Sequence, residues 1–356
     1  MERRRLTSSI CSLHLTDDPT GPSDWFHQLS AARKIRRVLV SVVIPVKDDV
    51  RVSNCLASIR ANRPDGDQLE ILVVDNNSVP DFSNWLQSLQ PAAAVIAETG
   101  LGAYGARNAG IERAAGDVVM FTDADCTVRP DWIASALAAL VETKADIVQG
   151  FSGNAEPPIK IARLIQQRYA ARFRSLRFGE GTECDTRNLA VRREVFERIR
   201  FNPDYRRVGD TEFGLKAESM GFRVAYSSEM YVAHSHDEAL DVFVAKQVCH
   251  GWGAQRLNVF DPKITWRGAY LRPRTRITPA VGRLPGVRGF GRGLASASIV
   301  AARGLQAVHR PAPGFIASAA LAVLDKIALL GGQLMFYPES PEPSVSELLG
   351  RQVLRD

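Results

Sequence analysis

Cysteine is sparse in this sequence and follows none of the spacings that give it a structural role. The five cysteines of the 356-residue chain are scattered, and no two form a CxxC pair: Cys11, Cys55, Cys126, Cys184 and Cys249. An odd number of isolated cysteines excludes a disulfide framework and a cysteine-based zinc site as organising features. We therefore expect a protein of the reducing cytoplasm.

A hydrophobic run long enough to cross a bilayer is also missing. The most apolar stretch, residues 314–337, is divided by Asp325 and Lys326 into two runs of eleven residues. A charged pair at the centre of a bilayer is costly, so a helix lying on a membrane or packed on the domain is favoured over a spanning helix. Residues 1–15 contain three arginines but no apolar core, which argues against a signal peptide.

Acidic residues are nearly absent from one segment of an otherwise balanced chain. Residues 261–310 carry ten Lys or Arg against a single acid, giving +9 there and −3 in the remainder of a chain whose net charge is +6. This segment is either a solvated tail or a surface that attracts anionic phospholipid. Nucleic acid is a weaker partner because aromatic residues interleaved for base stacking are lacking. We expect peripheral attachment to the inner face of the cell membrane.

The remainder of the chain alternates short β-branched runs with helical patterns. Strands are predicted over residues 38–46, 69–74, 93–97, 117–122, 147–151 and 224–226. Helices are predicted over residues 53–62, 80–89, 103–115, 131–143, 159–178, 193–199, 210–220 and 240–248. Because successive parallel strands need crossover helices, we predict an α/β fold with a doubly wound, mostly parallel sheet flanked by helices.

Polar residues follow three of these strands, at residues 45–48, 75–78 and 123–125. Ligands on doubly wound sheets bind beyond the carboxyl ends of the strands, so these residues should border one crevice. Asp123 and Asp125 place two carboxylates one residue apart, and such hard oxygen ligands suit Mg²⁺ or Mn²⁺. Taken alone, the triplet is equally typical of an acidic turn without a metal.

Several longer motifs occur together with this triplet. They are SVVIPVKDD at 41–49, LVVDNNS at 72–78, GARNAGIERAAGDVVMFTDAD at 105–125, RRVGDTEFGLKAESMGFRV at 206–224 and HSH at 234–236. In order and spacing they resemble the family 2 glycosyltransferases, which have the GT-A fold, over about 200 residues. The resemblance implies an N-terminal extension (1–37), a GT-A domain (38–258) and a basic, apolar, helical C-terminal region (259–356). Within the domain, residues 38–125 would form the nucleotide-binding half and 126–258 the acceptor half.

The resemblance also implies roles for individual residues in binding the donor, a nucleotide-diphosphate sugar, with a UDP-sugar favoured. The nucleotide would be bound by Pro45, Val46, Asp48, Asp75, Arg107 and Asp123, with Asp75 accepting hydrogen bonds from the base. Asp123 would also belong to the metal shell, Asp125 would be the direct ligand of Mn²⁺ or Mg²⁺, and His234 or His236 would complete the coordination. Asp75 is equally well explained as a turn-capping carboxylate.

Asp210 occupies the position of the family's general base, which removes the proton of the attacking hydroxyl in an inverting displacement. By spacing alone Asp210 is a helix-capping residue, and Glu212 is the alternative base because Gly209 replaces the first of two acids common in this motif. Asn188 is expected to contact the acceptor, and Trp252 either contacts it or holds the C-terminal region. No QxxRW motif follows, so the resemblance to processive polysaccharide synthases is poor and we expect non-processive transfer. Peripheral membrane attachment would suit a saccharide or lipid-linked saccharide acceptor of envelope or exopolysaccharide assembly.

Three other functions remain open at this level. GLGAYG at 100–105 satisfies GxGxxG, as in an NAD(P)-dependent oxidoreductase, but it follows the third predicted strand, whereas the dinucleotide fingerprint follows the first. A sugar nucleotidyltransferase would need a glycine-rich basic loop after the first strand, where this chain has VKDDV. A non-catalytic membrane-binding protein would have no use for Asp123, Asp125 and Asp210 together.

Overall fold

The structure is a computed structural model, and the statements below concern the residues that it describes. These are residues 38–62, 69–89, 93–98, 102–155, 167, 173, 176–179, 184–235, 239–260, 284–307, 314–336 and 341–350. Contacts divide the chain into Met1–Arg37 and Val38–Asp356, and the first unit lies outside the described residues. The same is true of most of the predicted helix over 159–178 and of His236.

Eight strands form one sheet in the order β3-β2-β1-β4-β7-β6-β8-β5. Neighbours among β3, β2, β1 and β4 are parallel, as are β6 and β8, whereas β7 runs antiparallel to β4 and β6, and β5 antiparallel to β8. Their bounds are β1 (Val40–Val46), β2 (Leu69–Asn76), β3 (Ala94–Glu98), β4 (Val118–Phe121), β5 (Cys126–Val128), β6 (Ile147–Asn154), β7 (Leu189–Arg192) and β8 (Val224–His234). The predicted mostly parallel sheet is confirmed.

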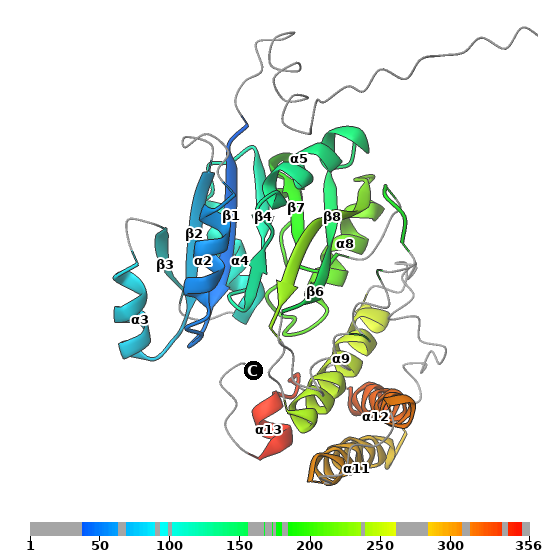
Figure 1. The fold of residues 1–356 in the computed structure, drawn as a ribbon. Coiled ribbons are helices and arrows are strands. Elements are labelled where there is room, and N and C mark those ends of the chain that lie inside the picture. The colour runs from blue at the N-terminus through cyan, green and yellow to red at the C-terminus, as the bar shows by residue number, and fades with distance from the viewer. Residues whose placement is uncertain are drawn as a thin grey trace, which may run out of the picture. The chain divides into compact units, whose positions relative to one another are not determined.

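Helices cover both faces of this sheet (Figure 1). One face is covered by α2 (Val52–Arg60), α3 (Pro80–Gln87) and α5 (Trp132–Glu142), and the other by α4 (Gly102–Arg113), α7 (Arg193–Phe196) and α8 (Gly209–Ser219). In β1, Val42 and Ile44 belong to the first core and Val43 to the second. A strand buried on both faces needs a near-continuous apolar run, which is why β1 lacks polar alternation although it contains Ser41.

Three strand predictions need correction. β5 and β7 are not predicted because they have only three and four residues, which is too short to show a period. β8 continues to His234, eight residues beyond the predicted end. Ser227, Ser228 and Glu229 interrupt its apolar pattern, and a register irregularity in its pairing with β6 lies opposite them.

The described parts of the C-terminal region are mainly helical, as predicted, and form a third core with α9 (Leu240–Phe260). Its helices are α11 (Val287–Ala307), α12 (Gly314–Met335) and α13 (Val345–Leu349). α9 extends twelve residues past its predicted end at 248 through Gly251, where an added Cβ would clash with the backbone of Leu329 in α12. Tertiary packing therefore overrides the low helix propensity of glycine. None of the described helices combines the length and apolarity that crossing a membrane requires.

A buried carboxyl, Glu342, connects the segment after α12 to the loop before α8. Its Oε2 accepts a hydrogen bond from the Arg206 backbone N–H at 3.0 Å. Within the described part of the chain its Oε1 has no hydrogen-bond partner. Burial raises the pKa of Glu342 to about 7, against the lowering effect of the Arg206 hydrogen bond and of nearby arginines. The folded protein therefore holds this proton more tightly than the unfolded chain does.

We expect the free energy of unfolding to fall as pH rises from about 4.5 to above 7, by up to about 3 kcal/mol from this group alone. The contribution of a raised carboxyl pKa to the free energy of unfolding is fully present below the pKa of the unfolded chain and is lost above the pKa of the folded protein. Glu342→Gln should remove this part of the slope and be more stable than the wild type at pH 8. Urea unfolding at pH 5 and pH 8 measures this, with exposed Glu197→Gln as control. Equal slopes in all three proteins would contradict it.

Candidate metal and donor site

The loop after β4 presents two carboxylates at the carboxyl end of the parallel strands. The Cys126 N–H donates to the Asp123 carbonyl at 3.0 Å, which closes a tight turn between β4 and β5. Ala124, between the two aspartates, is buried, while the side chains of Asp123 and Asp125 are 29% and 15% exposed. The strand-end position predicted for this pair is therefore observed.

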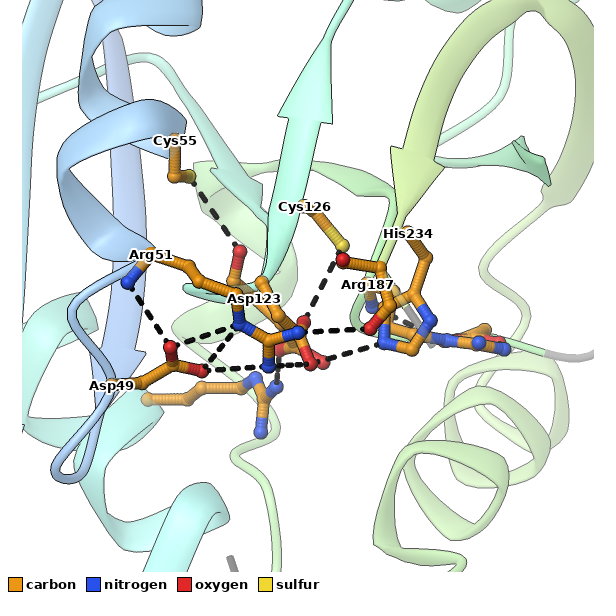
Figure 2. A network of polar contacts seen from close by, with 11 residues as sticks. Asp49, Arg51, Cys55, Asp123, Cys126, Arg187 and His234 are labelled. Atoms are coloured by element: carbon orange, nitrogen blue, oxygen red, sulfur yellow. Dashed lines mark hydrogen bonds and ion pairs between the residues drawn. The ribbon is translucent and has the colours of Figure 1, made fainter. Parts of the chain in front are cut away.

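The β5–β8 pairing brings His234 to this turn. His234 lies opposite Cys126 in the ladder, and the Ser235 N–H donates to the Asp125 carbonyl at 3.0 Å. The His234 Nε2 atom lies 3.2 Å from Asp125 Oδ2, and the Cys126 Sγ atom lies 3.8 Å from Asp125 Oδ1 (Figure 2). One ligand atom from each of the three residues falls within 4.8 Å of the others. The fold thus joins Asp125 and His234, 109 positions apart in the sequence, into one cluster.

The electrostatics of the cluster favour a hard cation. Burial alone would raise the pKa of Asp125, but the charge and hydrogen bond of His234, together with Arg51, hold it well below its usual range. Burial and the two neighbouring aspartates raise the pKa of the Cys126 thiol, which stays protonated and is a poor ligand. A carboxylate oxygen and an imidazole nitrogen remain, a donor set that suits Mn²⁺, or Mg²⁺ with more oxygen ligands.

Asp123 is held by Arg107 of α4. The Arg107 Nη2 atom lies 2.5 Å from Asp123 Oδ1, and its Nη1 donates to the Ala103 carbonyl at 3.2 Å. Burial and the charge of Asp125 raise the pKa of Asp123, and Arg107 opposes this. Arg107 is only 4% exposed, so its observed role is to neutralise and orient Asp123.

The loops after β1 and β2 are linked by the remaining predicted donor residues. Asp48, at φ 49°, accepts the Val79 N–H at 2.8 Å, and its own N–H donates to Ser78. Asp75 is 5% exposed, and its two oxygens accept the Ser78 N–H at 3.1 Å and the Ser83 hydroxyl at 2.5 Å. The turn-capping interpretation of Asp75 thus describes its bonds, and its contact with a base stays a prediction. Pro45 and Val46 end β1 beside these loops.

Asp210 lies in the first turn of α8 and contacts α4. Its Oδ1 accepts the Tyr104 hydroxyl at 3.1 Å and the Thr211 N–H at 2.9 Å. An added Cβ at Gly209 would lie 2.6 Å from the Tyr104 ring, so this ring leaves no room for the acid that the motif often carries there. Asp210 is partly exposed, whereas Glu212 is 5% exposed, so Asp210 is the better placed of the two to meet a substrate.

The two residues predicted to contact the acceptor are both buried. Asn188 is completely buried, and its amide accepts from Trp132 Nε1 at 2.8 Å and donates to the Phe151 and Met230 carbonyls. Its amide therefore links the start of β7 to α5, β6 and β8, and a contact with an acceptor stays a prediction. Trp252 is 3% exposed and packs edge-on against Phe336 with ring centroids 5.0 Å apart, which agrees with its alternative role of holding the C-terminal region.

Four charged residues near the carboxylates, in two Arg–Asp pairs, are absent from the sequence prediction. Arg51 and its partner Asp49 lie between β1 and α2, and Arg187 forms a fork with Asp185 before β7 (Figure 2). Arg187 also lies close enough to lower the pKa of Asp123. Two segments of the sequence could have indicated these residues. The acidic KDD segment next to Arg51 follows β1, which ends at this edge, and the CDTRN segment containing Arg187 precedes β7, which begins there.

Comparison with proteins of known sequence supports a relationship for the central part of the chain. Residues 41–200 match the family model described as glycosyl transferase family 2. Glycosyltransferase AglE of Haloferax volcanii is 27% identical over 208 residues, which cover 55% of this chain and 66% of AglE. A match of 84 residues at 31% identity to polypeptide N-acetylgalactosaminyltransferase 15 of Mus musculus covers 22% of this chain and 13% of that protein. The chain thus spans just under two thirds of AglE and a small part of the mouse enzyme.

Solved structures share the fold. The mannosyltransferase PcManGT from Pyrobaculum calidifontis, in complex with GDP-Man and Mn²⁺, superimposes with a TM-score of 0.52 at 17% identity. The match covers 89% of this chain and 94% of PcManGT. This likeness confirms the predicted GT-A fold class.

Proposed function

We propose that this chain, whose residues 41–200 match the model of glycosyl transferase family 2, transfers a sugar from a nucleotide-diphosphate donor to a hydroxyl acceptor with the help of a divalent cation. The observation that carries the proposal is the joining of Asp125 and His234 at the carboxyl ends of the parallel strands. This edge is where doubly wound sheets bind nucleotides.

Asp125 and His234 would hold the cation, with Asp123 beside them. Bound there, Mn²⁺ or Mg²⁺ would offset the charge of the departing nucleoside diphosphate. The residues fit this task because Asp125 is kept ionised and the protonated thiol of Cys126 does not compete. The presence of Mn²⁺ and GDP-Man in the PcManGT complex supports the same assignment.

The nucleotide would lie along the loops that end β1, β2 and β4. Pro45, Val46, Asp48 and Asp75 border this side, and Arg107 holds Asp123 in place for a ribose or a metal-bound water. This assigns the donor to residues 38–125 and the acceptor to residues 126–258, with residues 259–356 as a separate region. We favour a UDP-sugar as donor, and GDP-sugars form the second class to test.

Asp210 would serve as the general base of an inverting, non-processive transfer. A base must reach the acceptor hydroxyl, and Asp210 is partly exposed at the helix start while the Tyr104 hydroxyl orients its Oδ1. The Thr211 N–H also donates to Oδ1 at 2.9 Å, so the carboxylate is held in place at the positive end of α8, which suits proton removal from a saccharide hydroxyl. Glu212 is buried and serves less well.

Tyr104→Phe is expected to lower kcat about tenfold, the cost of one hydrogen bond to a charged group, with the donor KM unchanged. The phenyl ring should still fill the space beside Gly209 and stack on Phe201, so the melting temperature should change little. Steady-state kinetics and thermal melting of both proteins check this. An unchanged kcat would show that the hydroxyl does not position Asp210.

A thermal-shift screen tests the proposed function directly. We expect at least one nucleotide-diphosphate sugar or nucleoside diphosphate to raise the melting temperature by several degrees with Mn²⁺ present and much less without it. NAD⁺ and NADP⁺ should have no effect. Stabilisation by NAD(P) alone, or by nucleotides regardless of metal, would refute the proposal and restore the alternatives.

Neither alternative enzyme class gains support from the structure. Gly102, which has a positive φ, begins α4, and Tyr104 of the same GLGAYG segment packs against Gly209. These two residues of the motif therefore have structural roles within the fold. The loop after β1 is acidic: Asp49 pairs with Arg51, and Asp48 accepts the Val79 N–H. A nucleotidyltransferase would have a basic, triphosphate-binding loop at this place.

We further propose that the C-terminal region binds an anionic membrane surface, which would suit a lipid-linked saccharide acceptor of envelope or exopolysaccharide assembly. α11 exposes Phe290 and Val300, at 63% and 66%, on a helix that also carries Arg288 and Arg292. α12 packs against α9 and α11 and contributes the exposed Val323. Apolar and basic side chains on one helix are the composition of an interfacial helix.

We expect most of the protein to sediment with vesicles of anionic phospholipid at low salt, and less than half as much at high salt, because the basic contribution is screened. Phe290→Asp should reduce binding at both salt concentrations. Neutral vesicles serve as the control. Retention in the supernatant of anionic vesicles at low salt would contradict membrane attachment.

A further inference from the structure

Arg51 reaches from the loop between β1 and α2 into the cluster of Asp125 and His234. Its Nη2 atom lies 3.1 Å from Asp125 Oδ2, and its Nη1 donates to the Ser235 carbonyl at 3.0 Å. Arg51 thereby joins the three segments that build the cluster (Figure 2).

A second carboxylate, that of Asp49, also binds the side chain of Arg51. Asp49 accepts from Arg51 Nε at 3.0 Å and from Nη2 at 2.9 Å, and it also accepts the Arg51 backbone N–H at 3.1 Å. Asp49 is 5% exposed, so it needs a cationic partner at all times. Asp49 therefore holds the guanidinium at Nε and Nη2, and the same Nη2 atom also reaches Asp125.

Arg51 and a divalent cation require the same atom. The Oδ2 of Asp125 is the oxygen that lies nearest both His234 Nε2, at 3.2 Å, and Arg51 Nη2. A cation bound between Asp125 and His234 would lie against the guanidinium, and two positive charges at such a separation repel each other strongly. Either the guanidinium or the cation must therefore leave the Oδ2 atom of Asp125.

The charges of the cluster indicate how the protein can hold both Arg51 and the divalent cation. Asp49, Asp123 and Asp125 carry three negative charges, and Arg51 and Arg107 carry two positive ones, while Arg187 is neutralised by Asp185. With His234 neutral, as a metal-ligating imidazole is, one net negative charge remains, and a divalent cation converts it into one net positive charge. The negative charge of a bound diphosphate would outweigh this positive charge, and its oxygens would accept hydrogen bonds from the displaced guanidinium.

We propose that Arg51 is a counter-cation of the metal site that is displaced from Asp125 by the divalent ion and then donates to a phosphate oxygen of the donor, while Asp49 keeps its hold. This inference rests on the proposed function and extends it by one diphosphate-binding residue. It makes the binding of cation and nucleotide mutually dependent: the ion alone binds weakly because it must displace Arg51. The nucleotide strengthens ion binding by accepting the displaced side chain.

Titration of Mn²⁺ alone, and of UDP and GDP at saturating Mn²⁺, tests this proposal by calorimetry. For Arg51→Ala we expect Mn²⁺ alone to bind roughly tenfold more tightly, and the nucleotide that binds the wild type to bind roughly tenfold more weakly, each near the strength of one charge-assisted hydrogen bond. Arg60→Ala, an exposed arginine of α2, should behave as the wild type. Unchanged affinities in Arg51→Ala, or weaker binding of Mn²⁺ alone, would overturn the proposal.

A second variant covers the case in which Arg51→Ala fails to fold because Asp49 is left buried without its cation. The double variant Asp49→Asn, Arg51→Gln removes both charges, and we expect the same opposite changes in Mn²⁺ and nucleotide affinity. Its circular dichroism spectrum reports folding. Wild-type protein that binds neither Mn²⁺ nor nucleotide would refute the proposed function itself, whereas normal wild-type binding with unchanged variants would refute only the role of Arg51.

Discussion

Asp125→Asn is expected to weaken Mn²⁺ binding, and to lower the rate of sugar transfer, by at least about 100-fold. The amide keeps the size of the side chain and can still accept a hydrogen bond from His234, but it lacks the charge that His234 and Arg51 preserve in the wild type. Calorimetric titration with Mn²⁺ and steady-state turnover of the donor measure the two effects.

Asp131→Asn provides the matched control for this variant. Asp131 forms an exposed ion pair with Arg129, and its side chain is 48% exposed, so losing its charge should leave metal binding and turnover unchanged. Full turnover and undiminished Mn²⁺ affinity in Asp125→Asn would show that the cation, if any, is bound elsewhere.

Asp210→Asn is expected to lower kcat by roughly 100- to 1,000-fold while donor and Mn²⁺ affinities stay within about twofold of the wild type. The amide can still accept from Tyr104 and the Thr211 N–H but cannot remove a proton from the acceptor hydroxyl. Turnover at saturating donor, together with calorimetry for donor binding, separates the chemical step from binding.

Glu212→Gln and Glu112→Gln test the assignment of the base. Glu112 is exposed on α4, and its substitution should be neutral, while Glu212 is buried and its substitution should act mainly on stability. If Glu212→Gln loses kcat and Asp210→Asn does not, the general base has been assigned to the wrong carboxylate.

The sequence predicts the parallel half of the fold well because its signals there are local. β4 is apolar at every position and β1 at all but Ser41, and helices of 8 to 12 residues separate the strands. β7 carries no such signal: its four residues are strand because β4 and β6 flank them. The antiparallel half therefore depends on pairing between distant segments, which no sequence window contains.

The site shows the same division. The Asp123–Asp125 turn follows from a strand end, and His234 from the motif resemblance, but the partners of these residues do not. Tyr104 lies 106 positions from Asp210, and Arg51 lies 74 positions from Asp125. Asn188 shows a further limit, since its fully buried amide makes hydrogen bonds to α5, β6 and β8 that no local pattern in the sequence predicts.

The central claim is that Asp125 and His234 hold the cation that binds the diphosphate of the donor. Electron paramagnetic resonance of Mn²⁺ titrated into the protein with UDP or GDP counts the bound ion directly. The account predicts one bound Mn²⁺ per chain with the nucleotide present, and loss of that ion in both Asp125→Asn and His234→Ala. Equal Mn²⁺ binding by the wild type and both variants would contradict it.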